Sequence, residues 1–92
     1  MGEVIALPRR LDAATAPALA ADLLDYVQLS DLYLDARDTT HVGAMGAQVL
    51  LSAKRTMETS ARTFKLLNLS DRARSQLSNM GLVELLPPEE DT

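Results

Sequence analysis

The sequence predicts a small α/β domain, an open sheet of about four mixed strands with helices packed on it. Short β-type runs alternate along the chain with stretches whose apolar residues recur every three or four positions, which is typical of amphipathic helices. The chain has 92 residues, 47% of them hydrophobic. A globular chain of this length has room for little more than two packed layers.

The first third of the chain predicts a strand, a helix and a second strand. An apolar run over residues 4–7 ends at a proline, and its partner strand is expected to begin near residues 10–11. A helix is expected from the N-cap Thr15 to about Val27, because apolar residues recur there at helical spacing. Residues 32–36 are expected to form the next strand. The predicted buried stripe of the helix is Leu19, Leu23, Tyr26 and Val27.

The rest of the chain repeats this alternation. A second helix follows Gly43, with Ala47, Leu50, Leu51 and Lys54 on one side and Gln48, Ser52, Arg55 and Glu58 on the other. Residues 63–69 predict a strand. Ser70 is expected to cap a third helix that buries Ala73, Leu77 and Met80 and ends in a Schellman closure at Gly81 and Leu82. Residues 83–86 are either an edge strand or a final packed turn.

Charge is distributed unevenly along the chain. Residues 1–42 carry three basic and seven acidic side chains, whereas residues 43–86 carry six basic and three acidic ones. Two prolines and three acidic residues in 87–92 predict a solubilising tail after a domain of residues 1–86. The basic residues of the second half either face solvent or offer a surface to an acidic partner. They are Lys54, Arg55, Arg62, Lys65, Arg72 and Arg74.

The composition argues against several classes of function. With no Cys, one His and no carboxylates at metal-site spacing, the chain is expected to bind neither metal nor cofactor. His41 lies near Asp35 and Asp38, but no serine elbow or second His accompanies it, so no catalytic residue is expected. Aromatic residues make up 3%, too few for a nucleic-acid stacking surface. Without a signal-peptide pattern or an apolar run of about 18 to 20 residues, a cytoplasmic protein is expected, with no membrane insertion.

One segment stands out as a candidate interaction site. Gly43, Ala44, Met45 and Gly46, named the 43–46 turn below, join a strand end to a helix start. The first backbone N–H groups of a helix lack partners within it, so such a turn can accept an anion or a partner's carboxylate. The glycine spacing matches no dinucleotide-binding or phosphate-binding loop. The residues alone therefore leave two readings open, a tight turn or a docking surface.

The order and spacing of these segments resemble the STAS domain family, named after sulfate transporters and anti-sigma factor antagonists. The resemblance rests on Leu11-Asp12 before the first helix and on residues 33–36, 42–46 and 64–82. It spans about residues 3–86. It implies the family fold, a small sheet of mixed strands with helices packed on it.

The 43–46 turn departs from the family pattern. In the antagonists of this family it carries Asp-Ser-Ser/Thr-Gly, whose first Ser is phosphorylated by a partner kinase to switch binding off. Aligning Gly46 with the motif glycine places Gly43 at the Asp and Ala44 at the phosphoacceptor. Ala44 has no hydroxyl and Met45 cannot replace it, so the resemblance implies the docking surface without its usual switch. Thr39 and Thr40 lie four to five residues early and are interpreted as turn residues.

The resemblance implies a non-enzymatic regulatory module that binds an anti-sigma factor or a histidine-kinase-like protein. Residues 43–53 are also similar to small stand-alone STAS proteins associated with bacterial chemotaxis kinases. The alternative is a STAS subunit that binds the ATPase of a bacterial phospholipid ABC transporter. Self-association is left open. The expected contact residues are Thr39, Thr40, His41, Gly43, Ala44, Met45, Gly46 and Gln48.

Overall fold

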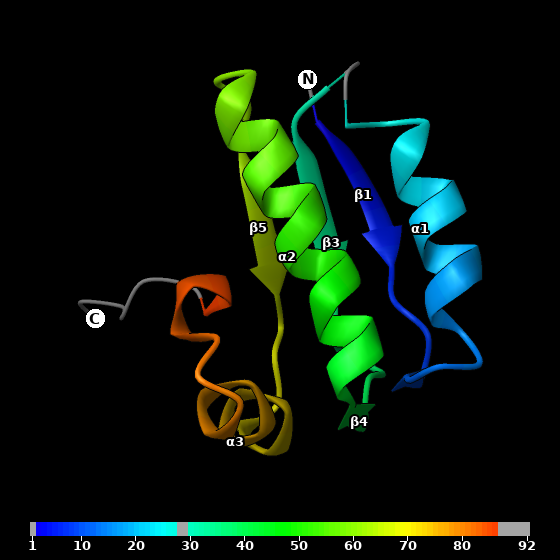
Figure 1. Cartoon of the computed structure of the whole chain (residues 1–92), viewed down its shortest axis with the longest axis vertical. Coiled ribbons are helices and arrows are strands. Elements are labelled where there is room, and N and C mark those ends of the chain that lie inside the picture. The colour runs from blue at the N-terminus through cyan, green and yellow to red at the C-terminus, as the bar shows by residue number, and fades with distance from the viewer. Residues whose placement is uncertain (1, 28–29, 87–92) are drawn as a thin grey trace.

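Five strands in two sheets and three α-helices form the described part of the chain, residues 2–27 and 30–86 of a computed structural model (Figure 1). The larger sheet has the strand order β1-β3-β5 and the smaller one joins β2 to β4. The strands are β1 (Glu3–Ala6), β2 (Arg10–Leu11), β3 (Leu32–Asp35), β4 (His41–Val42) and β5 (Phe64–Leu67).

The α/β class is confirmed, but the strands differ from the prediction in two ways. Every strand pair in the described part is parallel, so the sheet is not mixed. The expected pairing of residues 4–7 with residues 10–11 is also wrong, because β1 pairs with β3 and β2 pairs with β4. The Leu7 amide still bonds the Asp35 carbonyl, at 2.8 Å, and Pro8 has no N–H to continue the ladder. The chain therefore leaves the larger sheet at Pro8 and pairs again beside β4.

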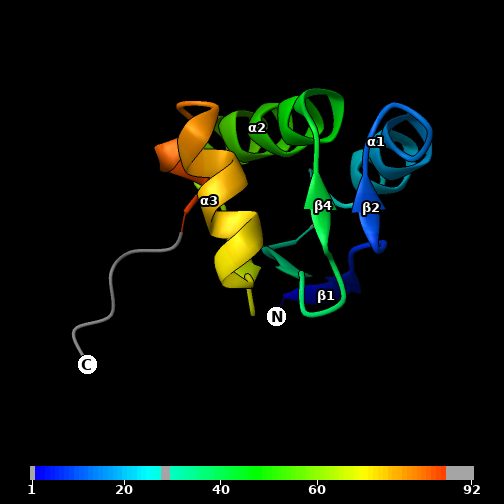
Figure 2. The same ribbon diagram turned by 90° about the horizontal axis from the view of Figure 1, so that it is seen from below.

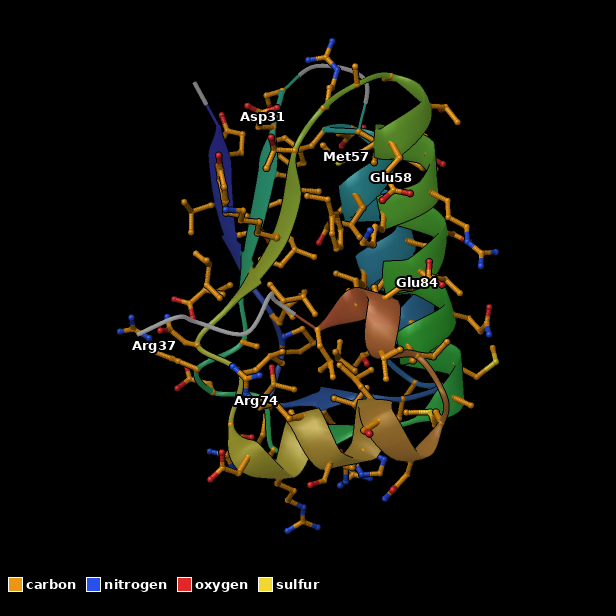
Figure 3. All side chains as sticks on the ribbon, turned by 90° about the vertical axis from the view of Figure 1, so that its left-hand side faces the viewer. Asp31, Arg37, Met57, Glu58, Arg74 and Glu84 are labelled. Atoms are coloured by element: carbon orange, nitrogen blue, oxygen red, sulfur yellow. The ribbon has the colours of Figure 1, made fainter. Side chains whose placement is uncertain are left out.

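The two helices α1 (Ala16–Leu24) and α2 (Ala44–Thr59) lie side by side on one face of the larger sheet (Figure 2). No helix of the described residues covers the opposite face, whose side chains project freely in Figure 3. The core fills the space between the sheet and these helices, since alternate strand residues face inward. Its fully buried members include Leu32, Leu34, Leu50 and Met57.

The third helix, α3 (Asp71–Asn79), begins and ends as predicted. The Ser70 hydroxyl accepts a hydrogen bond from the Ala73 amide at 3.1 Å. At the other end Gly81 has φ +75°, and the Leu82 amide bonds the Leu77 carbonyl at 3.0 Å. This is the Schellman closure. Residues 83–86 form a packed turn rather than a strand, with a 3₁₀ helix, η1 (Val83–Leu85).

The first helix is shorter than predicted and is capped differently. α1 ends at Leu24, and residues 25–27 continue as turns that bury Val27. Thr15 occupies the N-cap position, but its side chain makes no capping bond. Asp12 instead fixes the turn that precedes the helix, because its Oδ1 accepts the amides of Ala14 and Thr15 at 3.1 and 3.2 Å. The expected acidic tail, residues 87–92, lies outside the described residues.

Candidate functional site

The 43–46 turn is held in place by the smaller sheet. β2 and β4 run side by side and lead to the starts of α1 and α2 (Figure 2). The Gly43 amide extends this pairing with a 2.7 Å hydrogen bond to the Leu11 carbonyl. One residue earlier, the Val42 amide donates at 2.7 Å to Oε1 of Gln76, a side chain of α3. The turn is therefore fixed by segments that lie more than 30 residues away on either side.

Gly46 is the buried side of this turn. A Cβ at Gly46 would lie 2.6 Å from the Leu11 Cβ and 2.7 Å from the Leu11 carbonyl carbon. Such distances are impossible without moving backbone, so only glycine lets α2 approach β2 this closely. Gly46 is buried and positions the turn, and it offers little surface of its own to a partner.

The outer side of the turn is open. Ala44 and Gln48 are exposed, and Met45 is 56% exposed. The first backbone hydrogen bond inside α2 runs from the Ala47 amide to the Gly43 carbonyl, so the amides before Ala47 lack an intrahelical acceptor. Gly43 supplies no side-chain cap either. The outer side thus combines small side chains with unpaired N–H groups and one exposed methionine.

Different environments surround Thr39, Thr40 and His41, the predicted contact residues that precede the turn. Thr39 is 1% exposed, and its hydroxyl donates to the Pro8 carbonyl at 2.9 Å, so it is shielded from any partner. Thr40 is exposed, with its hydroxyl 3.4 Å from the Arg9 carbonyl. His41 is half-buried, and its Nε2 would lie 3.4 Å from a Cβ placed on Gly43. Of the three, only Thr40 and His41 can contribute to a contact surface around the turn.

Two carboxylates near the site are held by the fold. Arg10 donates from Nε to Asp12 at 3.1 Å, and this bond, joined by the amides of Ala14 and Thr15, lowers the pKa of Asp12. Asp35 accepts Nδ2 of Asn68 and the Arg37 amide, each at 3.0 Å, and the Asn68 bond is the main reason its pKa is lowered. Both groups remain ionised and occupied by structural bonds, Asp12 at the start of α1 and Asp35 between the ends of β3 and β5.

Within residues 2–27 and 30–86, no group of three or more His, Asp or Glu side chains converges as a metal site would require. Within the same ranges, no helix combines the length and the apolar character needed to cross a membrane.

Sequence reasoning missed two features of the site. Gln76 fixes the strand that enters the turn, yet a glutamine on a helix gives no local signal of a bond formed 34 residues away. The groove beside the turn was missed too. Its apolar lining comes partly from Leu24 of α1, which is 72% exposed.

Fold and site together define a small parallel α/β domain whose distinctive surface is an open helix start. The profile of the STAS domain family matches residues 3–92. The chain therefore belongs to the STAS domain family.

Comparison with solved structures supports the same fold. A sulfate transporter family protein from Wolinella succinogenes superposes with a TM-score of 0.78 at 20% identity, over 94% of this chain and 71% of that one. The anti-sigma factor antagonist SpoIIAA in its unphosphorylated form also gives a TM-score of 0.78, at 19% identity, over 98% of this chain and 81% of that one. A search of curated protein sequences finds no match.

Proposed function

We propose that this chain is a non-enzymatic regulatory module that binds a cytoplasmic kinase-type protein through the 43–46 turn and the outer face of α2. The partner is an anti-sigma factor or a histidine-kinase-like protein, including the kinases of chemotaxis. The observation that carries the proposal is the uncapped, exposed start of α2 on a buried frame. Its likeness in fold to an anti-sigma factor antagonist supports the choice of partner class.

The contact surface follows from exposure. Ala44, Met45 and Gln48 are exposed, and Thr40 and His41 flank them. Free N–H groups at the helix start can bond a partner's carboxylate or carbonyl oxygens, and the small side chains let its backbone approach. Gly46 and Thr39 belong to the frame beneath, since both are buried.

A charge placed at Ala44 tests the docking surface. In the family, phosphate at this position switches binding off, so Ala44→Asp should weaken binding by about tenfold to a hundredfold, because a partner must desolvate the added carboxylate. The matched control is Ala18→Asp, which adds the same charge at an exposed position in the first turn of α1.

The measurement is a calorimetric titration of both variants against purified anti-sigma or histidine-kinase proteins encoded beside the gene, with thermal melts of each. Folding should be preserved, since an acid at the positive end of a helix is favourable. Equal affinity of wild type and Ala44→Asp would reject this surface. Binding to a transporter ATPase instead of a kinase would establish the alternative function.

We also propose that the family's serine switch is absent from this chain. Incubation with such a kinase and ATP should leave the intact mass unchanged, because Ala44 has no acceptor and Thr39 is buried. Thr40 is the nearest exposed hydroxyl. Phosphate mapped to Thr40 would show that the switch has moved rather than been lost.

A further inference from the structure

The short strand β4 is held on two sides, and only one of its neighbours is a strand. In Figure 2 it lies between β2 and the helix α3, which contacts it. On the β2 side, the His41 amide bonds the Arg9 carbonyl at 3.4 Å. The Gly43 amide bonds the Leu11 carbonyl at 2.7 Å. Successive amides of a strand point to opposite sides, so the Val42 amide faces α3, where no strand of residues 2–27 and 30–86 continues the sheet.

A side chain takes the place of that missing strand. Oε1 of Gln76 accepts the Val42 amide at 2.7 Å, as short as the backbone bond on the other side of β4. The bond is partly buried, so an amide left there without an acceptor would lose water and gain nothing in return. The other polar atom of the Gln76 carboxamide, Nε2, makes no hydrogen bond within the described residues. In that part of the chain the carboxamide therefore serves β4 alone.

The helix that carries Gln76 is anchored close to it. Leu77 is the next residue, and Ala73 lies three positions earlier on the same side of the helix. Both are fully buried, and Gln76 itself is half-buried. A side chain on a backbone fixed in this way holds its acceptor oxygen in one place, as a directional bond to Val42 requires.

We propose that Gln76 is a positioning residue for partner recognition, which fixes β4 from the side opposite β2 and so sets the direction in which the 43–46 turn presents its unpaired amides. This rests on the proposed function, in which those amides bond the partner. Gly43 directly follows Val42 and is the N-cap of α2, so a shift of β4 reorients the first turn of the helix. Hydrogen bonds weaken steeply when misaligned, so affinity depends on amides that are aimed before the partner arrives.

Positioning is distinguishable from two other roles of Gln76. A purely structural role would lower affinity only as far as it lowers the stability of α3. A direct contact between Nε2 and the partner would make affinity depend on that N–H donor. Positioning instead makes affinity follow the acceptor that the Val42 amide requires, whichever group supplies it.

Amide hydrogen exchange of the free protein tests the positioning without any partner. In the wild type the Val42 amide should exchange at least about tenfold more slowly than the amides of Ala44 and Met45, which lack an intrahelical acceptor. Gln76→Met keeps the length of the side chain but lacks the oxygen. It should speed exchange at Val42 by about tenfold and shift the amide signals of the 43–46 turn.

Gln76→Glu supplies an acceptor again and should return the exchange rate and the amide signals to near those of the wild type. Two results would overturn the proposal. One is exchange at Val42 as fast as at Ala44 and Met45 in the wild type. The other is a Gln76→Met variant with unchanged exchange and unchanged amide signals.

The second measurement is a titration of each variant against the kinase-type protein encoded beside the gene, at high salt to screen the charge of Gln76→Glu. Gln76→Met should weaken binding about threefold to tenfold, which corresponds to the net contribution of one hydrogen bond, and Gln76→Glu should restore most of it. Ser70→Ala is the matched control. It also removes a hydrogen bond from α3 but leaves the bond between Gln76 and Val42 intact, so it should bind like the wild type.

The titration also identifies the competing roles. An equal loss from Ser70→Ala would show a general effect of α3 stability. A loss in Gln76→Glu as large as in Gln76→Met would show that Nε2 contacts the partner. Either result would overturn the proposal.

The two measurements separate this inference from the proposed function. If no kinase-type protein bound the wild type, the proposed function would fail, while the exchange rates would still decide whether Gln76 positions the turn. If Gln76→Met changed exchange and amide signals but not affinity, the docking surface would keep its function and Gln76 would lose its role in recognition.

Discussion

The helices α3 and α2 begin with the same backbone geometry but different chemistry. Ser70 and Gly43, their N-caps, are both extended, with ψ of 163° and 176°. Ser70 accepts the Ala73 amide, and Asp71 adds a negative charge in the first turn of α3. Gly43 offers no acceptor, and the first turn of α2 contains no acid. One helix start is completed by its own sequence and the other is left open.

The open start is nevertheless rigidly supported. Its underside packs on Leu11, and the strand before it is bonded to α3 through Gln76. Its first turn lacks a side-chain cap, although the backbone beneath it is fixed. The turn is thus held by packing on its underside, and its upper surface stays exposed.

Removing the anchor of α3 should have the largest effect. Leu77 is fully buried, so Leu77→Ala should lower the free energy of unfolding by about 2–5 kcal/mol through the lost contacts and the cavity. Val83→Ala, at an exposed position just after α3, should cost about 0.5 kcal/mol or less. Urea unfolding of both variants and the wild type measures these two changes in stability. A loss below about 0.5 kcal/mol for Leu77→Ala would show that α3 is not anchored to the core as described.

The next largest effect is expected at Gly46, and it should differ from the effect at Gly43, the other glycine at the start of α2. A serine Cβ at position 46 would meet Leu11 at 2.6 Å, so Gly46→Ser should cost about 1–3 kcal/mol by overpacking. At position 43 the nearest atom is 3.4 Å away, so Gly43→Ser should fit. It should even add a few tenths of a kcal/mol as an N-cap. Equal stabilities of the two variants in urea would contradict the close packing of α2 on β2.

Local features of this fold could be predicted from the sequence, whereas its long-range pairings could not. The ends of α3 were predicted to the residue, because an N-cap serine and a left-handed glycine act within one or two turns of the helix. In the predicted stripe of α2, Ala47, Leu50 and Leu51 are buried, whereas Lys54 is only half-buried. The pairing of β2 with β4 and the bond between Gln76 and Val42 were not predicted, since they join residues at least 31 positions apart and leave no local pattern.

The same limit applies to the candidate site. The 43–46 turn and its lost hydroxyl could be read from residue types and from the family pattern. The sequence could not show that Thr39 and Gly46 are buried while Ala44 and Met45 are exposed, because all of them lie within eight positions on one short segment. Thr39 and Gly46 are buried by contacts with Pro8 and Leu11, which lie in and just before β2, far away in the sequence.

Removing the Ser70 cap of α3 should lower the free energy of unfolding moderately. Ser70→Ala removes the acceptor of the Ala73 amide and should cost about 1 kcal/mol. Ser70→Asp, which restores an acceptor, should recover most of that loss. If Ser70→Ala left the free energy of unfolding and Tm unchanged, the cap would not stabilise the fold. The two helix starts would then differ in geometry but not in stability.

The smallest change in stability is expected from adding an N-cap acceptor to α2. Gly43→Asp places an acceptor and a negative charge beside the unpaired amides of α2, at the position where the resemblance puts the family's Asp. We expect a gain of about 0.3–1 kcal/mol in the free energy of unfolding, because the carboxylate bonds the helix start and interacts with its dipole. For a domain of this size, 0.5 kcal/mol raises Tm by roughly 2–4 °C.

Gly43→Asn is the control for this last variant, since it supplies an acceptor without charge. Melts at low and high salt should show the advantage of Asp over Asn shrinking as salt rises, while the gain that both share persists. There is room for either side chain, because the closest atom is Nε2 of His41 at 3.4 Å from the added Cβ. If neither variant raised Tm, the amides at the start of α2 would already be satisfied in the free protein, and the docking turn would lose the feature on which its function is proposed.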